Sequence, residues 1–338
     1  MKLKKMFMIV LLVLLAAACS QQDEQVEEET VNERESAEPK TTFPLTGIAT
    51  SESTDARAVA VMINNHVQAR PQSGLQDADL VYEILAEGEV TRFLAVYQSE
   101  FPDRVGPVRS ARDYYIRLAK GLDAIYIHHG YSPEAKQLME SGYIDHLDGM
   151  VYDGTLFVRD KSRKAPHNSY IAFDDIIKGA KENSFEMESA PRPLEFLNEE
   201  QLASLSGNQG SDFTVTYGNA SFDVTYEYSE SDLAYKRFSA NEQTVDNDTG
   251  EPVLLNNIVV IEAHHEVVDQ EGRRDIDLKS GGKGYLMQKG VWNEIEWINQ
   301  DSQLIFMTGQ DEVKLVPGKT WINIIPDQPG LETAVTFK

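Results

Sequence analysis

The chain has 338 residues, a formal net charge of −24 and one cysteine, Cys19. A body this acidic is expected not to bind nucleic acid, because sequence-independent binding needs a positive surface. The single cysteine excludes a disulfide within the chain, and the length is sufficient for two ordinary domains with real cores.

The first residues predict a secretory signal peptide over 1–18. Lysines precede an apolar run at 6–15, which is too short to span a bilayer comfortably, and three alanines lead to Cys19. The string "LLAAAC" resembles a bacterial lipobox, although Ala16 stands where that pattern prefers Leu. We therefore expect Cys19 to carry the lipid (palmitate) and to hold the protein on the extracytoplasmic face of the cell membrane, since two or more acyl chains give lasting anchorage. The alternative is an ordinary secreted protein with a chance cysteine.

Residues 19–42 are predicted to form an acidic, disordered tether. Within 20–40 there are eight acidic residues, two basic residues and almost nothing to bury. Such a stretch stays extended and solvated, which suits a spacer between a lipid anchor and a folded body.

Residues 43–185 are predicted to form an α/β domain with a mixed sheet. Its helices and strands follow from apolar runs, turn residues and helix caps. They are a buried strand over 58–63, a hairpin over 79–98, a helix from the Gly106-Pro107 turn to about Lys120, a strand over 123–130, a helix from Pro133 to Gly142 and a helix near 173–182. A helix over 79–86 is the alternative to the first half of the hairpin.

Residues 186–210 contain prolines and glycines and are predicted to connect two domains. From 211 to 338, short strand-like runs alternate with turns every eight to twelve residues, which indicates a mainly antiparallel β-rich domain. Its three tryptophans, Trp292, Trp297 and Trp321, are expected in the core rather than on a carbohydrate-binding surface. The predicted fold class is therefore α+β.

Several motifs together resemble one known family. The lipobox, the acidic tether, "GPVRSARDYY", "HHGYSP", "APHNSY" and "GKTWINIIP" are similar to the YerB-type lipoproteins of Gram-positive bacteria, over essentially the whole mature chain. The resemblance implies an envelope lipoprotein with an N-terminal and a C-terminal domain. It implies no reaction, because the family is one of unknown function.

Three arginines, Arg104, Arg109 and Arg112, stand within nine residues beside the Gly-Pro turn. Pro107 suits the first turn of the helix expected here, and Ser110 with Asp113 forms an alternative capping box. Under either start, Arg109 and Arg112 lie in or beside the first turn, where the dipole disfavours cations by roughly 0.3–1 kcal/mol each. Basic side chains at a helix start, with free backbone N–H groups, form a receptor for phosphate or carboxylate. The segment therefore predicts an anion-binding site that Arg104 reaches from the turn.

The alternative interpretation of this segment is a solvated helix face. On a helical wheel, Arg109, Arg112 and Asp113 fall opposite the apolar side. Arg109 with Asp113 would form an i,i+4 pair worth roughly 0.2–0.5 kcal/mol. Both interpretations are compatible with the sequence.

Polar residues follow two predicted strands, as Asn64-Asn65-His66 and His128-His129. If the strands are parallel, their carboxyl ends share one crevice with the arginine segment. Adjacent strand residues point to opposite faces, so one of the two neighbouring histidines would face the crevice. The candidate ligand-binding residues are Arg104, Arg109, Arg112, Asn65, His128, His167 and Asn168. The candidate acids or bases are His128, His129 and His167, although any one of them is more often structural.

No motif predicts a metal or a cofactor. The chain has no His-Glu-x-x-His, no paired cysteines and no calcium loop, and "SGGKGYL" at 280–286 lacks the P-loop spacing. Glu83 and Glu87 could form an acid pair, but a hairpin edge explains them equally well.

Three functions are weighed. The first is a membrane-anchored lipoprotein that binds a phosphorylated or carboxylated envelope ligand through the arginine segment. The second is a phosphoryl-transfer or hydrolytic enzyme that adds histidine acid–base chemistry to the same arginines. The third is a non-catalytic envelope adaptor whose β-rich domain binds a protein partner.

Overall fold

The apolar run predicted as a strand forms β3 (Val59–Asn64), in which all six residues are buried. A strand without polar alternation needs cover on both of its faces, and β3 has it. The computed structural model describes residues 41–338, so the predicted signal peptide, Cys19 and nearly all of the tether lie outside the described residues. Within residues 41–338, no helix combines the length and apolarity needed to cross a bilayer.

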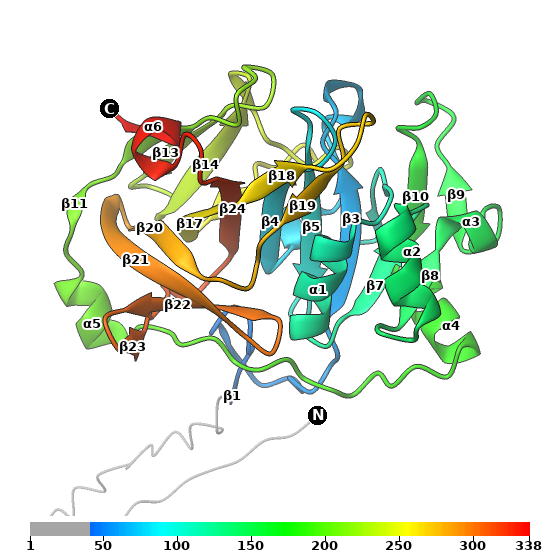
Figure 1. Cartoon of the computed structure of the whole chain (residues 1–338). Coiled ribbons are helices and arrows are strands. Elements are labelled where there is room, and N and C mark those ends of the chain that lie inside the picture. The colour runs from blue at the N-terminus through cyan, green and yellow to red at the C-terminus, as the bar shows by residue number, and fades with distance from the viewer. Residues whose placement is uncertain (1–40) are drawn as a thin grey trace, which may run out of the picture. The chain divides into compact units, whose positions relative to one another are not determined.

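The central element is a mixed sheet, and within residues 41–338 it has twelve strands (Figure 1). Its order is β23-β22-β21-β20-β17-β24-β4-β5-β3-β7-β8, with β11 paired to β21. The remaining strands of this sheet are β4 (Leu80–Leu85), β5 (Thr91–Tyr97), β7 (Ile125–His128), β8 (His146–Asp148), β11 (Asn208–Gln209), β17 (Asn257–Ala263), β20 (Gly282–Gln288), β21 (Val291–Gln300), β22 (Gln303–Thr308), β23 (Asp311–Glu312) and β24 (Thr320–Pro326).

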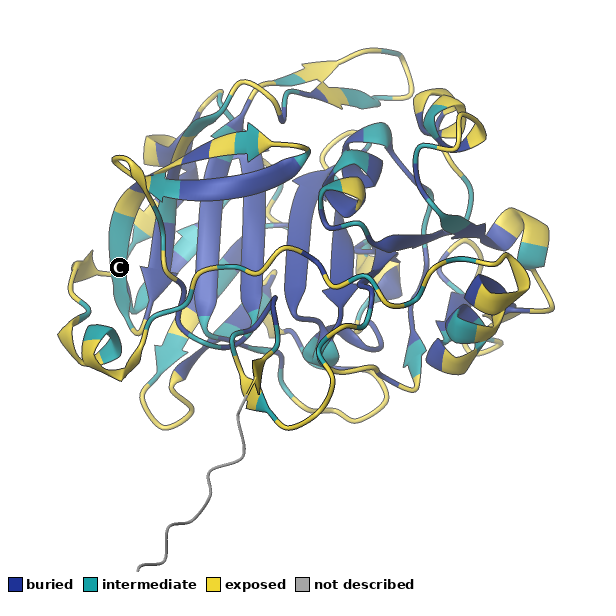
Figure 2. Cartoon of the chain, turned by 90° about the horizontal axis from the view of Figure 1, so that it is seen from below, coloured by how far each residue is buried: buried dark blue, intermediate teal, exposed yellow. Residues whose placement is uncertain are grey.

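Both halves of the chain contribute to this sheet. The late strand β24 lies between β17 and β4 and is parallel to both, with Trp321 opposite Ile258 and Val81. Figure 2 shows the buried strands of the two halves side by side. The predicted α+β fold, with a mixed sheet in the first half and mostly antiparallel pairing in the second, is confirmed.

Alternate residues of β3 enter two separate cores on the two faces of the sheet. Val59, Val61 and Ile63 pack with residues of α4 and of a six-stranded antiparallel sheet, whereas Ala60 and Met62 pack with α1 and α2. The six-stranded sheet consists of β12 (Asp212–Val215), β13 (Val224–Ser229), β14 (Ala234–Ser239), β15 (Glu242–Gln243), β16 (Leu254–Leu255) and β25 (Val335–Phe337).

The helices and the smaller sheets complete the described chain. The helices are α1 (Asp113–Gly121), α2 (Pro133–Glu140), α3 (Gly149–Tyr152), α4 (Phe173–Glu182), α5 (Glu199–Ser204) and α6 (Leu331–Ala334). One small sheet joins β6 (Arg104–Val105), β10 (Ser169–Ala172) and β9 (Phe157–Arg159); the others pair β1 (Thr41–Thr42) with β2 (Ala49–Thr50), and β18 (His265–Val267) with β19 (Arg274–Ile276). Two short 3₁₀ turns lie at Val67–Ala69 and Leu75–Asp77.

Two expectations about the first half are settled here. The hairpin over 79–98 is confirmed, since β4 and β5 pair antiparallel, and the alternative helix over 79–86 is wrong. The helix expected from the Gly106-Pro107 turn begins only at Asp113, so its predicted start is also wrong. The physical reason is that most backbone groups of residues 107–111 are hydrogen-bonded to neighbouring strands and loops, among them Arg109 N–H to Met62 O and Ala111 N–H to Gly130 O, and these groups cannot also close a helical turn.

Candidate functional site

The carboxyl ends of two parallel strands meet beside the arginine segment. β3 and β7 pair in parallel, with Val61 opposite Ile127, so their last residues reach the same edge of the sheet. The segment 107–111 crosses that edge. Its Arg109 N–H donates to Met62 O (2.9 Å), and Arg109 O accepts the N–H of His129 (3.0 Å). We name this edge, with Arg109, His129 and His167 around it, the strand-end crevice.

Arg104 does not join the other two arginines. Its Nε and Nη2 donate to the two carboxylate oxygens of Asp248 at 2.7 and 2.5 Å, and its Nη1 lies 3.3 Å from Asp160 Oδ2. The guanidinium also sits over the ring of Tyr170. The hydrogen bond from Arg104 lowers the pKa of Asp248 to about 2. The expectation that Arg104 reaches a shared anion site is therefore wrong, because its charge is already neutralised.

Arg112 is also committed to a carboxylate. It is the N-cap residue of α1 and only 8 % exposed, and its guanidinium donates to Glu87 and to the carbonyl of Ala111. The other Glu87 oxygen accepts from Arg92, which also donates to Ser110 O (2.7 Å). Burial lowers the pKa of Arg112. Glu87 thus bridges two buried guanidinium groups, and the prediction that Arg112 points toward a ligand is wrong.

Arg109 differs from its two neighbours. Its backbone is fixed on both sides, but within residues 41–338 its guanidinium has no hydrogen bond and no ion pair. Burial, and then the charge of Arg92, lower the pKa of Arg109 to about 10. A half-buried guanidinium that is repelled by a neighbouring cation favours an anion as its partner.

The two neighbouring histidines have different surroundings. His128 is fully buried; its Nδ1 lies 2.9 Å from Gly130 O and its Nε2 lies 3.0 Å from His146 Nδ1. Burial lowers the pKa of His128 to about 4, and both of its ring nitrogens are engaged within the fold, which favours a structural role over that of a ligand or an acid–base residue. His129 is half-buried; its Nε2 accepts from Arg159 Nη2 (2.8 Å), which leaves Nδ1–H to donate to Ser169 Oγ (2.8 Å).

His167 also lies near Arg109, whose positive charge acts on its ring. Its Nδ1 accepts from Asn64 Nδ2 (2.9 Å), and its ring stacks on His66 at 4.6 Å between centroids. The loop is held in place because Val108 N–H donates to Ser169 O (2.6 Å). The side chain of Asn168 contacts Arg159 instead: its Oδ1 accepts from Arg159 Nη1 (3.3 Å).

Asn65 points to the opposite face of the sheet from Asn64. Its amide nitrogen donates to Thr91 Oγ1 (2.7 Å), and its oxygen accepts from Arg70 Nε (2.9 Å) and from Gln72 Nε2 (3.2 Å). The Asn65 side chain therefore lies outside the strand-end crevice and is part of a buried polar network that the sequence did not predict.

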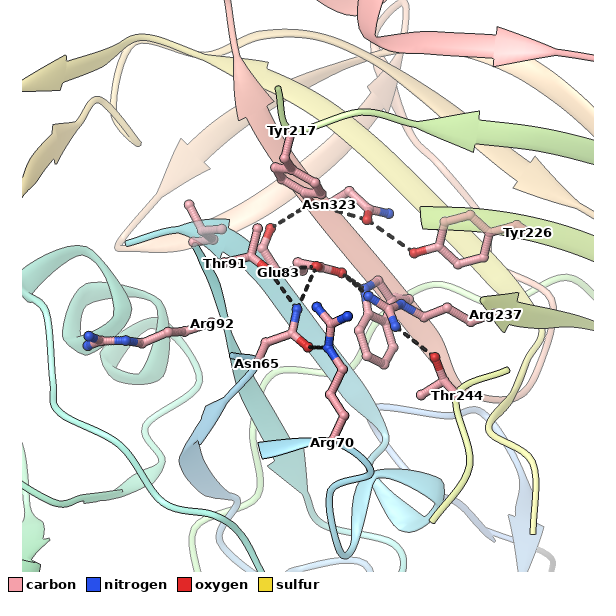
Figure 3. Close-up of polar contacts among 12 residues, drawn as sticks. Asn65, Arg70, Glu83, Thr91, Arg92, Tyr217, Tyr226, Arg237, Thr244 and Asn323 are labelled. Carbon is pink, nitrogen blue, oxygen red and sulfur yellow. Dashed lines mark hydrogen bonds and ion pairs between the residues drawn. The ribbon is translucent and has the colours of Figure 1, made fainter. Parts of the chain in front are cut away.

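The centre of that network is the buried ion pair of Glu83 with Arg237 (Figure 3). Glu83 is fully buried and accepts from Arg237 Nη2 (2.7 Å), Thr91 Oγ1 (2.9 Å) and Trp321 Nε1 (3.0 Å). Arg237 is 1 % exposed, and its guanidinium carbon lies 4.4 Å from the ring centroid of Trp321. One sequence signal could have found it: Arg237 stands two residues from Tyr235 in β14, on the inward-facing side of an alternating strand.

Comparisons with known proteins agree with this architecture. Residues 45–186 match the family model described as "Protein of unknown function (DUF3048) N-terminal domain", and residues 213–322 match its C-terminal domain. The chain is 46 % identical over 287 residues to "Putative lipoprotein YerB" of Bacillus subtilis (strain 168), covering 84 % of this chain and 86 % of that protein. It is also similar to the crystal structure of YerB from Bacillus subtilis, with a TM-score of 0.81 and 44 % identity over 88 % of this chain and 99 % of the other. The chain belongs to the DUF3048 family, a two-domain family of unknown function.

Proposed function

We propose that this protein is a membrane-anchored lipoprotein that binds an anionic envelope ligand, carrying phosphate or carboxylate groups, at the strand-end crevice. The observation that carries the proposal is the guanidinium of Arg109, which is half-buried and has no partner within the described residues. His129 and His167 lie close enough to interact with its charge, and so does Arg92, which is paired with Glu87. Arg163 and His66 lie beside His167, and Arg159, which is paired with Asp153, lies beside His129. A protein of net charge −24 thus holds, at one sheet edge, a guanidinium that no carboxylate within residues 41–338 neutralises.

The electrostatics of the two histidines support this proposal. Burial lowers the pKa of His129 and of His167, and the positive charge of Arg109 contributes in both cases. An anion bound to Arg109 would offset that charge and raise both pKa values. Binding would then take up protons, so affinity should rise as the pH falls from about 7 toward 5.

The geometry favours binding over catalysis at two of the three candidate histidines; His167, whose Nε2 makes no hydrogen bond within residues 41–338, stays a candidate acid or base. His128 is buried with both ring nitrogens in hydrogen-bonding contact, and both ring nitrogens of His129 are likewise engaged. Within residues 41–338, no group of three or more His, Cys, Asp or Glu side chains is arranged to hold a metal ion. Binding therefore remains the proposed activity.

Histidine-ring NMR of the full-length protein in detergent tests the ligand site. Sulfate is a suitable probe because its charge is constant between pH 5 and 8. Sulfate should raise the pKa of His129 and His167 in the native protein but not in Arg109→Gln. Arg104→Gln is the matched control, because its guanidinium is already paired with Asp248, and it should respond like the native protein.

Equal responses in Arg109→Gln and the native protein would contradict the proposed site. Repeating the titration with inorganic phosphate and with acetate then separates phosphorylated from carboxylated ligands, since the probe that binds more tightly identifies the class.

Lipid attachment is tested separately. Cys19→Ser should move the protein from the membrane to the soluble fraction and abolish labelling by palmitate; continued membrane retention would refute the anchor.

A further inference from the structure

We propose a second anion site, distinct from the strand-end crevice, in a cavity of about 140 Å³ lined by Arg70, Arg237 and Ser239. Thr244, Gln72 and Asn65 complete most of its polar lining. The cavity lies where the loop after β3 meets β14 and β15 of the six-stranded sheet. It is smaller than the roughly 300–1,000 Å³ pockets that hold whole drug-sized ligands, so it would take a small oxyanion or the anionic end of a larger molecule.

Three polar atoms of these residues are buried and have no hydrogen-bond partner within the described chain. They are Arg70 Nη2, Arg237 Nε and Ser239 Oγ. All three can donate a hydrogen, and all three residues line the same cavity. A buried donor without a partner costs about 1–3 kcal/mol, and more when it is charged. The Tyr226 hydroxyl lies beside the Arg237 guanidinium and outside the cavity lining, so Arg70 Nη2 and Ser239 Oγ are the two donors that indicate a missing acceptor in the cavity.

The charges around the cavity also indicate an anion. Arg70 and Arg237 contribute two positive charges, and Glu83 is the one buried carboxylate that opposes them. Burial, and then the charge of Arg237, lower the pKa of Arg70 to about 10. Glu242 also lines the cavity and opposes the lowering of the Arg70 pKa, but it is exposed, so solvent weakens its effect relative to that of buried Glu83. One bound anion would balance the buried charge.

Both guanidinium groups are held in place without a ligand. Arg237 Nη1 donates to Thr244 Oγ1 (2.8 Å) and Nη2 donates to Glu83, while Trp321 lies under the guanidinium. Arg70 Nε donates to Asn65 Oδ1 (2.9 Å), and its Nη1 donates to Ser221 O (3.0 Å). Figure 3 shows the two arginine side chains approaching Glu83 from different directions. Donors fixed in this way bind an anion without first losing side-chain entropy.

This site and the strand-end crevice lie on opposite faces of the end of β3. Asn64 contacts His167 on one face, and Asn65 contacts Arg70 on the other. The two sites therefore share no donor residue and can be tested independently.

The test is a sulfate titration of the full-length protein in detergent, followed through the indole N–H signal of Trp321. That N–H donates to Glu83, and the ring stacks on Arg237, so the signal reports on the cavity. Sulfate should shift it at millimolar concentration. Ser239→Ala should weaken the apparent affinity about 5- to 10-fold and Arg70→Gln about 10- to 100-fold, as expected for neutral and charged hydrogen bonds.

Arg109→Gln is the control, and it should leave the Trp321 response unchanged while abolishing the histidine responses of the strand-end crevice. The melting temperature of each variant confirms that it is folded. If Arg70→Gln unfolds, Ser239→Ala still tests the site, because it removes only one oxygen. A Trp321 signal that responds only at molar sulfate would mean an adventitious ion only, and the proposal would be overturned. It is also overturned if Ser239→Ala and Arg70→Gln respond like the native protein.

Discussion

Glu83→Gln is the substitution that perturbs the buried network most directly. Glu83 is fully buried and is the shared acceptor for Arg237, Trp321 and Thr91. Glutamine keeps the shape of the Glu83 side chain but removes its negative charge. Its NH₂ group takes the place of one carboxylate oxygen and there meets groups that themselves donate hydrogen bonds. Arg237 would then remain buried without a counter-charge.

The expected loss of stability is large. Removing one partner of a buried ion pair costs about 3–5 kcal/mol, because the other charge stays desolvated. At about 2.1 cal/mol/K per residue, roughly 300 folded residues give an unfolding entropy of about 0.6 kcal/mol/K. The melting temperature of Glu83→Gln should therefore fall by about 5–8 °C.

Thermal denaturation followed by circular dichroism measures this loss. The matched control is Glu294→Gln, the same chemical change at an exposed position of β21, which should alter stability by no more than about 0.5 kcal/mol. Sulfate should stabilise Glu83→Gln more than the native protein, because the cavity beside Arg70 and Arg237 gains one unit of positive charge. A melting temperature within about 2 °C of the native value, or equal stabilisation by sulfate, would refute the reasoning.

Three further predictions concern the strand-end crevice and its surroundings. Burial lowers the pKa of His128 to about 4, so the free energy of unfolding should fall by up to about 3 kcal/mol as the pH drops from 6.5 through 4. Urea denaturation should show that His128→Gln loses less stability on acidification than the native protein. A methyl group at Gly149 would lie 2.1 Å from His129 Nδ1, so Gly149→Ala should displace the His129 ring without changing any charge. The sulfate-induced shift of His129 in NMR should then weaken, and an unchanged shift would contradict an anion site beside His129. Asp248→Asn should cost no more than about 1 kcal/mol in thermal denaturation, because its pair with Arg104 is partly exposed, and should leave the His129 response intact.

Local sequence patterns predicted the strands well. The uninterrupted apolar run of β3 and the paired runs of β4 and β5 depend on burial and turn chemistry, which short segments encode. The position of β24 could not be predicted, because parallel pairing with β4 joins residues about 240 positions apart. Hydrophobic periodicity indicates that a strand is buried but does not identify its neighbours.

The arginine segment shows why the site was harder to predict than the fold. Capping and dipole arguments use local sequence, yet the partners of Arg112 and Arg104 are Glu87 and Asp248, which lie 25 and 144 positions away. Only Arg109 kept the open environment that the prediction required. Arg237, by contrast, stands in a strand whose alternation places it inward, so a charged residue at a core position was a usable signal.

The central claim is that an acidic protein keeps excess positive charge at one sheet edge, from Arg109 on one face of the end of β3 and from Arg70 beside the Glu83–Arg237 pair on the other. Anomalous diffraction from crystals grown in millimolar selenate tests it most directly, because selenium marks the bound oxyanion. We predict one peak beside Arg109, near His129 and His167, and another between Arg70, Arg237 and Ser239. Selenate absent from both places, with ordered water at the buried donors, would contradict the account.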